Sequence, residues 1–137
     1  MSTRSNIGIL RGEGGKVELI YCHWDGYPEH NGKILIEHYN KLSKLEKLMK
    51  LGDLSILGPE LGTKHNFETK DYSVCTAYGR DRGDRECNCR YFDSIHELNN
   101  NVEEYCYLYD VDNQEWILSD DGGHTFSKLA DVLAELI

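Results

Sequence analysis

Aromatic and imidazole side chains gather in one short stretch of the chain, residues 21–30. The dipeptide Asp25-Gly26 favours a turn and Pro28 opposes a central strand, so this stretch is predicted to be a loop. A rigid aromatic side chain on a loop provides contact area at a low entropic cost, which is typical of binding hot spots. The candidate binding residues here are His23, Trp24, Asp25, Tyr27 and His30. The alternative is that Trp24 and Tyr27 fold back as a lid on the core.

Arginines form a second group, and they lie close together in an otherwise acidic chain: Arg80, Arg82, Arg85 and Arg90. Guanidinium groups bind phosphates and carboxylates through paired hydrogen bonds. The group therefore indicates a local anion site, to which we assign Arg80, Asp81 and Arg82. The alternative is a solvated loop in which neighbouring Arg and Asp side chains neutralise each other.

Nucleophilic and metal chemistry have weaker support in the sequence. Cys22 and His23 are neighbours on a predicted strand, so their side chains point to opposite faces and do not form a nucleophile–base pair. Cys87 and Cys89 form a C-x-C pair, but a zinc site needs two more ligands and no second pair is present. The chain also lacks a phosphate-binding glycine loop, an H-E-x-x-H pair and a serine nucleophile elbow. We expect no catalytic residue, no cofactor and no metal.

The charge balance limits the partners. The formal net charge is −9, from 15 Lys and Arg against 24 Asp and Glu. General nucleic-acid binding rests on excess cationic side chains, so we expect no such binding and no attachment to an anionic membrane. Mimicry of DNA charge is disfavoured as well, because lysines are interleaved with the acids. A protein or a small anionic ligand remains as the expected partner.

The remaining composition is that of a soluble globular protein. No apolar run reaches the roughly 20 residues that span a bilayer. No apolar segment follows the N-terminal residues, so no secretory signal is expected. Five cysteines cannot all pair within the chain, and reduced thiols fit a cytoplasmic location. A length of 137 residues predicts a single domain over residues 1–137.

Alternating and β-branched segments predict the strands that must position these residues. Two hairpins are expected, one formed by 5–11 and 17–22 around a glycine-rich turn and one by 104–110 and 115–119. A further strand is predicted at 72–78. Since strands come mainly as hairpins, we expect an α+β fold with a largely antiparallel sheet of about five strands and helices packed on one face.

Apolar residues at three- and four-residue spacing predict the helices, at 33–39 with Asn31 as cap, at 42–51, and near the C-terminus from Phe126 onward. Ser43 and Glu46 fit a capping box, Gly52 fits a C-terminal stop, and Thr125 or Ser127 fits the cap of the last helix. Segments 53–70 and 79–90 are predicted to be irregular, and 94–99 to be a helical turn. The predicted core consists of Ile7, Ile9, Leu19, Leu45, Leu48, Val74, Leu108, Ile117, Leu129 and Leu133.

Three of the nine tyrosines, Tyr105, Tyr107 and Tyr109, alternate along one predicted strand and therefore share a face. If helices cover the opposite face, the tyrosine face is either a second core or an interface. The second alternative predicts a homodimer.

Several segments of the first 90 residues resemble a group of small proteins encoded by bacteriophages and prophages. They are residues 1–8, 21–28, 29–35, 37–39, 51–55 and 77–83. The group has no settled biochemical activity, so the resemblance implies a phage accessory protein made in a bacterial cytoplasm and carries over no catalytic residue. With the absence of catalytic motifs, it favours a non-enzymatic protein that binds a host protein or small ligand, including as a counter-defence inhibitor. The alternatives are a small nucleotide-processing hydrolase or transferase, with Arg80 and Arg82 on phosphate and Asp81 or His23 as acid/base, and a virion assembly factor.

The lone C-x-C pair and the adequate core size predict a fold that does not depend on metal. Treatment with a strong chelator should leave the thermal melting curve and the circular dichroism spectrum unchanged. Stoichiometric zinc in the purified protein, measured by elemental analysis, would contradict this expectation.

Overall fold

A hairpin near the N-terminus forms the centre of the sheet. The computed structural model describes residues 2–12 and 14–136; Met1, Glu13 and Ile137 of the predicted domain lie outside these residues. Strand β1 (Ser5–Arg11) pairs antiparallel with β2 (Lys16–Cys22), as predicted. Gly12 and Gly15 both have positive φ in the connecting turn, and the Gly15 amide donates to the Gly12 carbonyl at 3.1 Å. Glycine adopts that conformation at no steric cost, which explains the turn.

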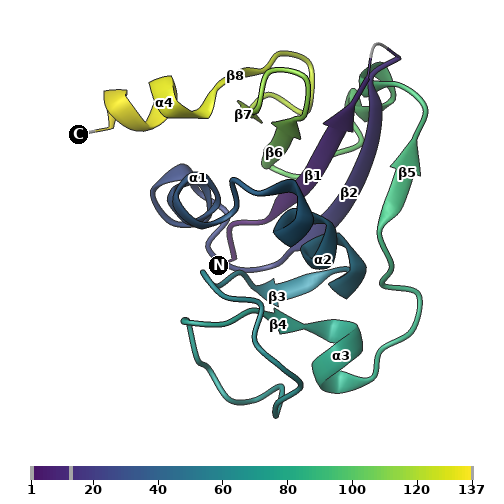
Figure 1. The fold of residues 1–137 in the computed structure, drawn as a ribbon, viewed down its shortest axis with the longest axis vertical. Helices are drawn as coiled ribbons and strands as arrows, with labels where there is room; N and C mark the ends of the chain where they lie inside the picture. Colours follow the sequence, from purple (N-terminus) through teal and green to yellow (C-terminus); the bar gives the residue numbers. More distant parts are fainter. Residues whose placement is uncertain (1, 13, 137) are drawn as a thin grey trace.

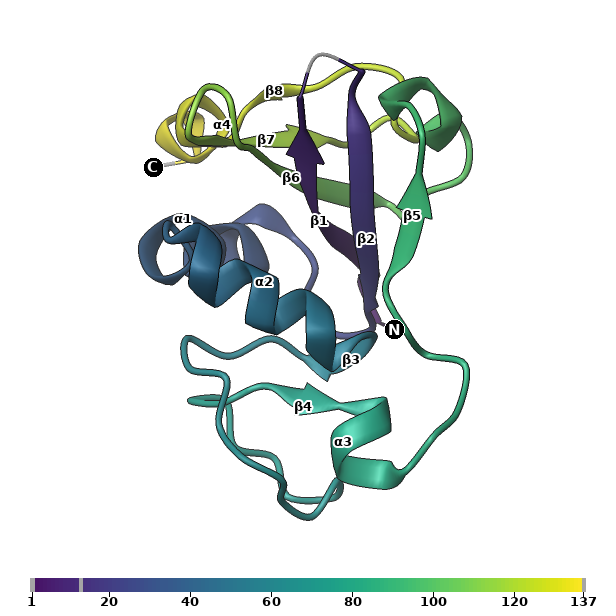
Figure 2. The ribbon, with the colours of Figure 1, turned by 45° about the vertical axis from the view of Figure 1, so that its right-hand side comes forward.

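The described residues form one open, mixed sheet of eight strands, in the order β4-β3-β2-β1-β6-β7-β8, with β5 also pairing with β2 (Figures 1 and 2). The other strands are β3 (Leu54–Ile56), β4 (Thr76–Ala77), β5 (Arg90–Phe92), β6 (Tyr105–Asp110), β7 (Glu115–Ser119) and β8 (Ser127–Lys128). The α+β class and the second hairpin, β6–β7, are confirmed.

The prediction of a largely antiparallel sheet of about five strands holds only in part: most strand pairs are antiparallel, but the sheet is mixed and has eight strands. Strands β1 and β6 pair in parallel, as do β2 and β3. The strands that sequence patterns miss, β3, β5 and β8, have only two or three residues, too few to display a period of two. The strand predicted at 72–78 shrinks to β4, because Tyr72 and Ser73 lie in a turn, Val74 makes only an isolated bridge with Glu60, and helix α3 begins at Tyr78.

The helices are α1 (Lys33–His38), α2 (Leu42–Leu51), α3 (Tyr78–Arg82) and α4 (Leu129–Glu135), with a π-helical turn η1 (Pro28–Gly32) and a 3₁₀ turn η2 (Ile95–Leu98). No side chain caps α2; its predicted capping residue Glu46 instead accepts a hydrogen bond from Arg11 at 2.9 Å. A capping box occurs at Ser94 and Glu97. Helix α4 begins later than predicted, because Ser127 and Lys128 pair with β7 and neither Thr125 nor Ser127 caps it.

Two apolar clusters lie on opposite faces of the sheet. The larger one packs α1, α2 and α4 against the sheet and includes Tyr107 and Tyr109, whereas Cys106 and Leu108 point into the smaller one, which η2 covers. Tyr107 and Tyr109 are therefore buried in the main core, with the half-buried Tyr105 packed against it, which is the second-core alternative for this face. The homodimer stays a prediction. Of the predicted core, Val74, Ile117 and Leu133 are only half-buried, and the other predicted residues are buried.

Truncation of the apolar face of α2 tests its role in the core. Leu48→Ala should lower the free energy of unfolding by about 2–5 kcal/mol, because it removes buried methyl groups and leaves a cavity. Lys47→Ala, at an exposed position in the same helix, is the matched control and should have little effect. Denaturant titration measures both, and an unchanged midpoint for Leu48→Ala would contradict the packing described here.

Candidate functional site

The loop of residues 23–27, here the Trp24 loop, is held against the sheet by buried hydrogen bonds. The Trp24 amide donates to the Ser55 carbonyl at 3.1 Å, and the Tyr107 hydroxyl donates to the Gly26 carbonyl at 2.6 Å. The fully buried Asn31 side chain donates from Nδ2 to the Trp24 carbonyl at 3.4 Å. Because the Tyr107–Gly26 bond is fully buried and the Asn31–Trp24 bond is partly buried, these bonds restrain the backbone of the loop.

The Trp24 indole stays open to solvent, with 40% of the residue's surface exposed. Its ring meets the His23 ring edge-on at a centroid distance of 4.7 Å, and His23 Nδ1 lies 2.6 Å from the Tyr21 hydroxyl. Trp24 is therefore no buried lid on the core. It is an aromatic side chain presented on a rigid backbone.

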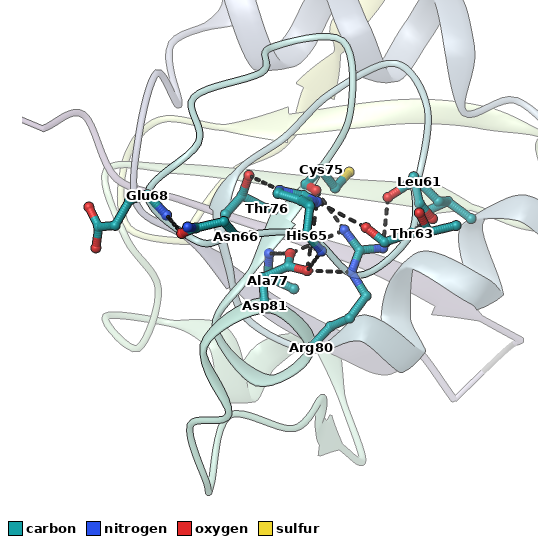
Figure 3. A network of polar contacts seen from close by, with 11 residues as sticks. Leu61, Thr63, His65, Asn66, Glu68, Cys75, Thr76, Ala77, Arg80 and Asp81 are labelled. Carbon is teal, nitrogen blue, oxygen red and sulfur yellow. Dashed lines mark hydrogen bonds and ion pairs between the residues drawn. The ribbon is translucent and has the colours of Figure 1, made fainter.

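Opposite Trp24 lies the long irregular segment 57–75, which joins β3 to β4. Arg80 of α3 holds it in place (Figure 3). Its Nη1 donates to the carbonyls of Leu61 and Gly62 at 2.8 and 3.2 Å, and its Nη2 donates to that of Cys75 at 2.7 Å. Nε and Nη2 also donate to the Asp81 carboxylate. A guanidinium has five N–H donors, so Arg80 has none left for a ligand.

Asp81 completes this arrangement, which we name the Arg80–Asp81 clamp. Its side chain is buried, and its oxygens accept the amides of Ala77 and His65 at 2.8 and 3.1 Å. Burial raises the pKa of the Asp81 carboxyl, but the hydrogen bonds from Arg80 and the two amides outweigh burial and hold it below its ordinary value.

The His65 ring is fixed at both nitrogens (Figure 3). Nδ1 lies 2.9 Å from the Thr63 carbonyl and Nε2 lies 3.1 Å from the Thr76 hydroxyl. Since a carbonyl only accepts, Nδ1 is the donor to the Thr63 carbonyl. The group of Thr76, His65 and Asp81 looks like a nucleophile–base arrangement, but Thr76 is 1% exposed and no substrate reaches its hydroxyl. The three residues therefore hold the segment in place.

Arg82 supports the same segment from another side. Its guanidinium carbon lies 4.5 Å from the centroid of the Phe67 ring and 4.9 Å from that of Tyr78. Its Nε and Nη2 donate to the two oxygens of Asp84 at 2.9 and 2.7 Å. The ring of Phe67 is thereby fixed by stacking, while Arg82 keeps its charge paired.

Between the Trp24 loop and this segment lies a surface hollow of about 340 Å³, here the Trp24 cleft. Its lining comprises Trp24, Asp25, Ser55, Ile56, Phe67, Glu68, Lys70 and Tyr72. The buried residues Ser55 and Ile56 come from β3, and Trp24 and Tyr72 are the exposed aromatics. The volume is at the small end of the range of roughly 300–1,000 Å³ that is usual for ligand pockets.

The structure divides the predicted site residues into four groups. Trp24 and Asp25 line the cleft, whereas Arg80, Asp81 and Arg82 position the wall that carries Phe67. His23 packs against the Trp24 ring but does not line the cleft. Tyr27 and His30 form a separate pair of tilted rings, with centroids 6.1 Å apart, and they also lie outside the cleft lining. Sequence reasoning missed Phe67, Glu68, Lys70 and Tyr72. The available signal was the presence of two aromatic residues, Phe67 and Tyr72, in a segment that is mostly polar and irregular.

The nearby thiols are poor nucleophiles. Burial raises the pKa of Cys22 to about 12 and also raises the pKa of Cys75, so both are protonated near neutral pH, whereas the thiolate is the reactive form. Cys87 and Cys89 are half-buried and donate to carbonyls of their own segment. Within residues 2–12 and 14–136, no three His, Cys, Asp or Glu side chains are grouped so as to hold a metal ion.

Comparisons with protein-family models, with curated proteins and with solved structures found no match. In the described part of the chain, no helix has the length and apolar character needed to cross a membrane.

Substitution of the clamp tests its role. Asp81→Asn should lower the free energy of unfolding by about 2 kcal/mol at pH 7, because Arg80 loses a charged acceptor. The folded-state pKa of Asp81 is lowered, so its contribution is complete above the unfolded pKa of about 3.9 and is lost as pH falls through the folded value. The stability difference between wild type and variant should therefore shrink below about pH 4.

Urea titrations at pH 7 and at acidic pH measure this difference. The control is Asp84→Asn, which removes the carboxylate partner of the more exposed Arg82 and should have a much smaller effect. A loss of stability that is equal at both pH values would show that the Asp81 charge does not contribute.

Proposed function

We propose that this protein is a non-enzymatic binding protein that holds part of a partner in the Trp24 cleft. The observation that carries the proposal is an exposed aromatic pair on fixed backbone: Trp24 is 40% and Tyr72 51% exposed, and hydrogen bonds fix the segments that bear them. Preorganised aromatic anchors lose little entropy on binding and are the usual centres of binding energy.

The chemistry of the cleft also favours binding over catalysis. Arg80 and Asp81, which a nucleotide-processing enzyme would need as phosphate clamp and acid/base, spend their hydrogen bonds inside the protein. His23, the other candidate acid/base, uses its Nδ1 in a hydrogen bond with the Tyr21 hydroxyl and packs its ring edge-to-face with Trp24. The hydrolase or transferase alternative therefore has no arrangement of these residues to support it.

A phage setting gives the binding protein a biological role. The segments that resemble small phage proteins supply Trp24 and Asp25 (21–28), the cleft residue Ser55 (51–55) and the clamp (77–83). On the basis of this resemblance, we propose that the protein acts in the cytoplasm of a bacterial host, where it binds a host protein or small ligand, including as a counter-defence inhibitor.

Capture from infected bacterial cells tests the proposal. Tagged wild-type protein and the variants Trp24→Ala and Tyr72→Ala are compared by quantitative mass spectrometry, with Tyr91→Ala as the matched control, since Tyr91 is 75% exposed and lies outside the cleft. A partner retained by wild type and control should be lost from both cleft variants, because an aromatic anchor contributes roughly 2 kcal/mol or more.

Circular dichroism and melting of each variant verify the fold. Equal capture by wild type and cleft variants would refute the cleft as the binding surface. The identity of the captured protein separates two roles: a host protein supports the inhibitor, whereas a capsid or tail protein supports a virion assembly factor.

A further inference from the structure

The Trp24 cleft carries more negative than positive charge. Two of its lining residues, Asp25 and Glu68, are acidic, and one, Lys70, is basic. Among the described residues, none of these three side chains takes part in an ion pair, so their charges are available to a ligand. The formal net charge of −9 adds a long-range attraction for cations.

The aromatic lining has the same preference. The face of an aromatic ring is electron-rich and attracts ammonium and guanidinium groups, most strongly for Trp. The protein already contains one such contact beside the cleft, since the guanidinium of Arg82 stacks over Phe67 and Tyr78. The exposed rings of Trp24 and Tyr72 have no cation of this kind among the described residues.

The small volume of the cleft, about 340 Å³, suits one long side chain. Its lining combines the apolar residue Ile56 with two carboxylates and exposed aromatic rings, and a side chain with methylene groups and a cationic end can contact all three kinds of group. A nucleotide would also stack on Trp24, but its phosphates would meet two carboxylates and a single ammonium group.

We infer that the Trp24 cleft binds an arginine side chain of a partner protein, with the guanidinium at the faces of Trp24 and Tyr72 and within reach of Asp25 and Glu68. This inference rests on the proposed function and names the chemistry that the partner must present. Arginine is favoured over lysine because its planar guanidinium both stacks on rings and pairs with carboxylates.

A short peptide provides the probe. Acetyl-Gly-Arg-Gly-amide is titrated into ¹⁵N-labelled protein at low salt, and the shifts of the Trp24, Ser55 and Glu68 backbone amides report binding. The citrulline peptide, which has the same shape without the charge, should bind about tenfold more weakly, because it loses both the cation–π and the charge–charge attraction.

Charge variants of the cleft sharpen the test. Glu68→Gln should weaken binding of the arginine peptide by about two- to fivefold, and Lys70→Gln should strengthen it by a similar factor. Asp112→Asn removes one negative charge, as Glu68→Gln does. Asp112 lies in the exposed β6–β7 turn, which β1 and β2 separate from β3 of the cleft in the strand order, so this variant should leave the affinity unchanged.

Three results would overturn the inference: no binding of the arginine peptide, equal binding of the citrulline peptide, or tighter binding of adenosine monophosphate that Lys70→Gln weakens. Capture that still depends on Trp24 would then leave the proposed function standing with a different ligand. Loss of that dependence would remove the proposed function itself, whatever the peptide does.

Discussion

The Arg80–Asp81 clamp is the interaction on which the candidate site depends. A long irregular segment carries carbonyls and amides that no helix or strand pairs, and leaving them buried without partners costs free energy. Arg80 donates hydrogen bonds to three of those carbonyls, and Asp81 accepts hydrogen bonds from the amides of His65 and Ala77. One ion pair therefore provides partners that a regular strand would find in a neighbouring strand. Together with the stacking of Arg82 on Phe67 and the backbone bonds of Glu60 with Ser73 and Cys75, the clamp keeps Phe67 and Tyr72 opposite Trp24.

The clamp also shows why an arginine group in a sequence has two interpretations. A guanidinium that recognises a phosphate and one that recognises carbonyls of its own chain use the same donors. Sequence gives the residue type and its neighbours, but only the path of segment 57–75 determines which acceptors reach Arg80. The sequence therefore left two interpretations open, an anion site or internal neutralisation, and the internal bonds of Arg80 with Asp81 and of Arg82 with Asp84 favour the second.

Prediction from sequence succeeded where periodicity is long and local. The two hairpins and α2 have six or more patterned residues each, and their apolar faces point to the core as expected. The parallel pairing of β1 with β6 could not be predicted in the same way, because it joins segments about a hundred residues apart. Asn31 shows the same limit within the site. Asparagine is a common helix cap, so Asn31 is predicted to cap the helix at 33–39. In the structure no side chain caps this helix, and the Asn31 side-chain amide donates to the Trp24 carbonyl instead.

The bond between the Tyr107 hydroxyl and the Gly26 carbonyl ties the Trp24 loop to the middle of the sheet. An insertion or deletion in this loop would move the Gly26 carbonyl away from the buried Tyr107 hydroxyl. The length of the loop is therefore constrained, as the identity of a core residue is. Gly26 itself admits no side chain, since a Cβ there would lie 2.7 Å from Ser5. A change of partner preference is therefore expected through side-chain substitutions at cleft positions such as Trp24, Asp25, Glu68 and Lys70, with the length of the loop kept.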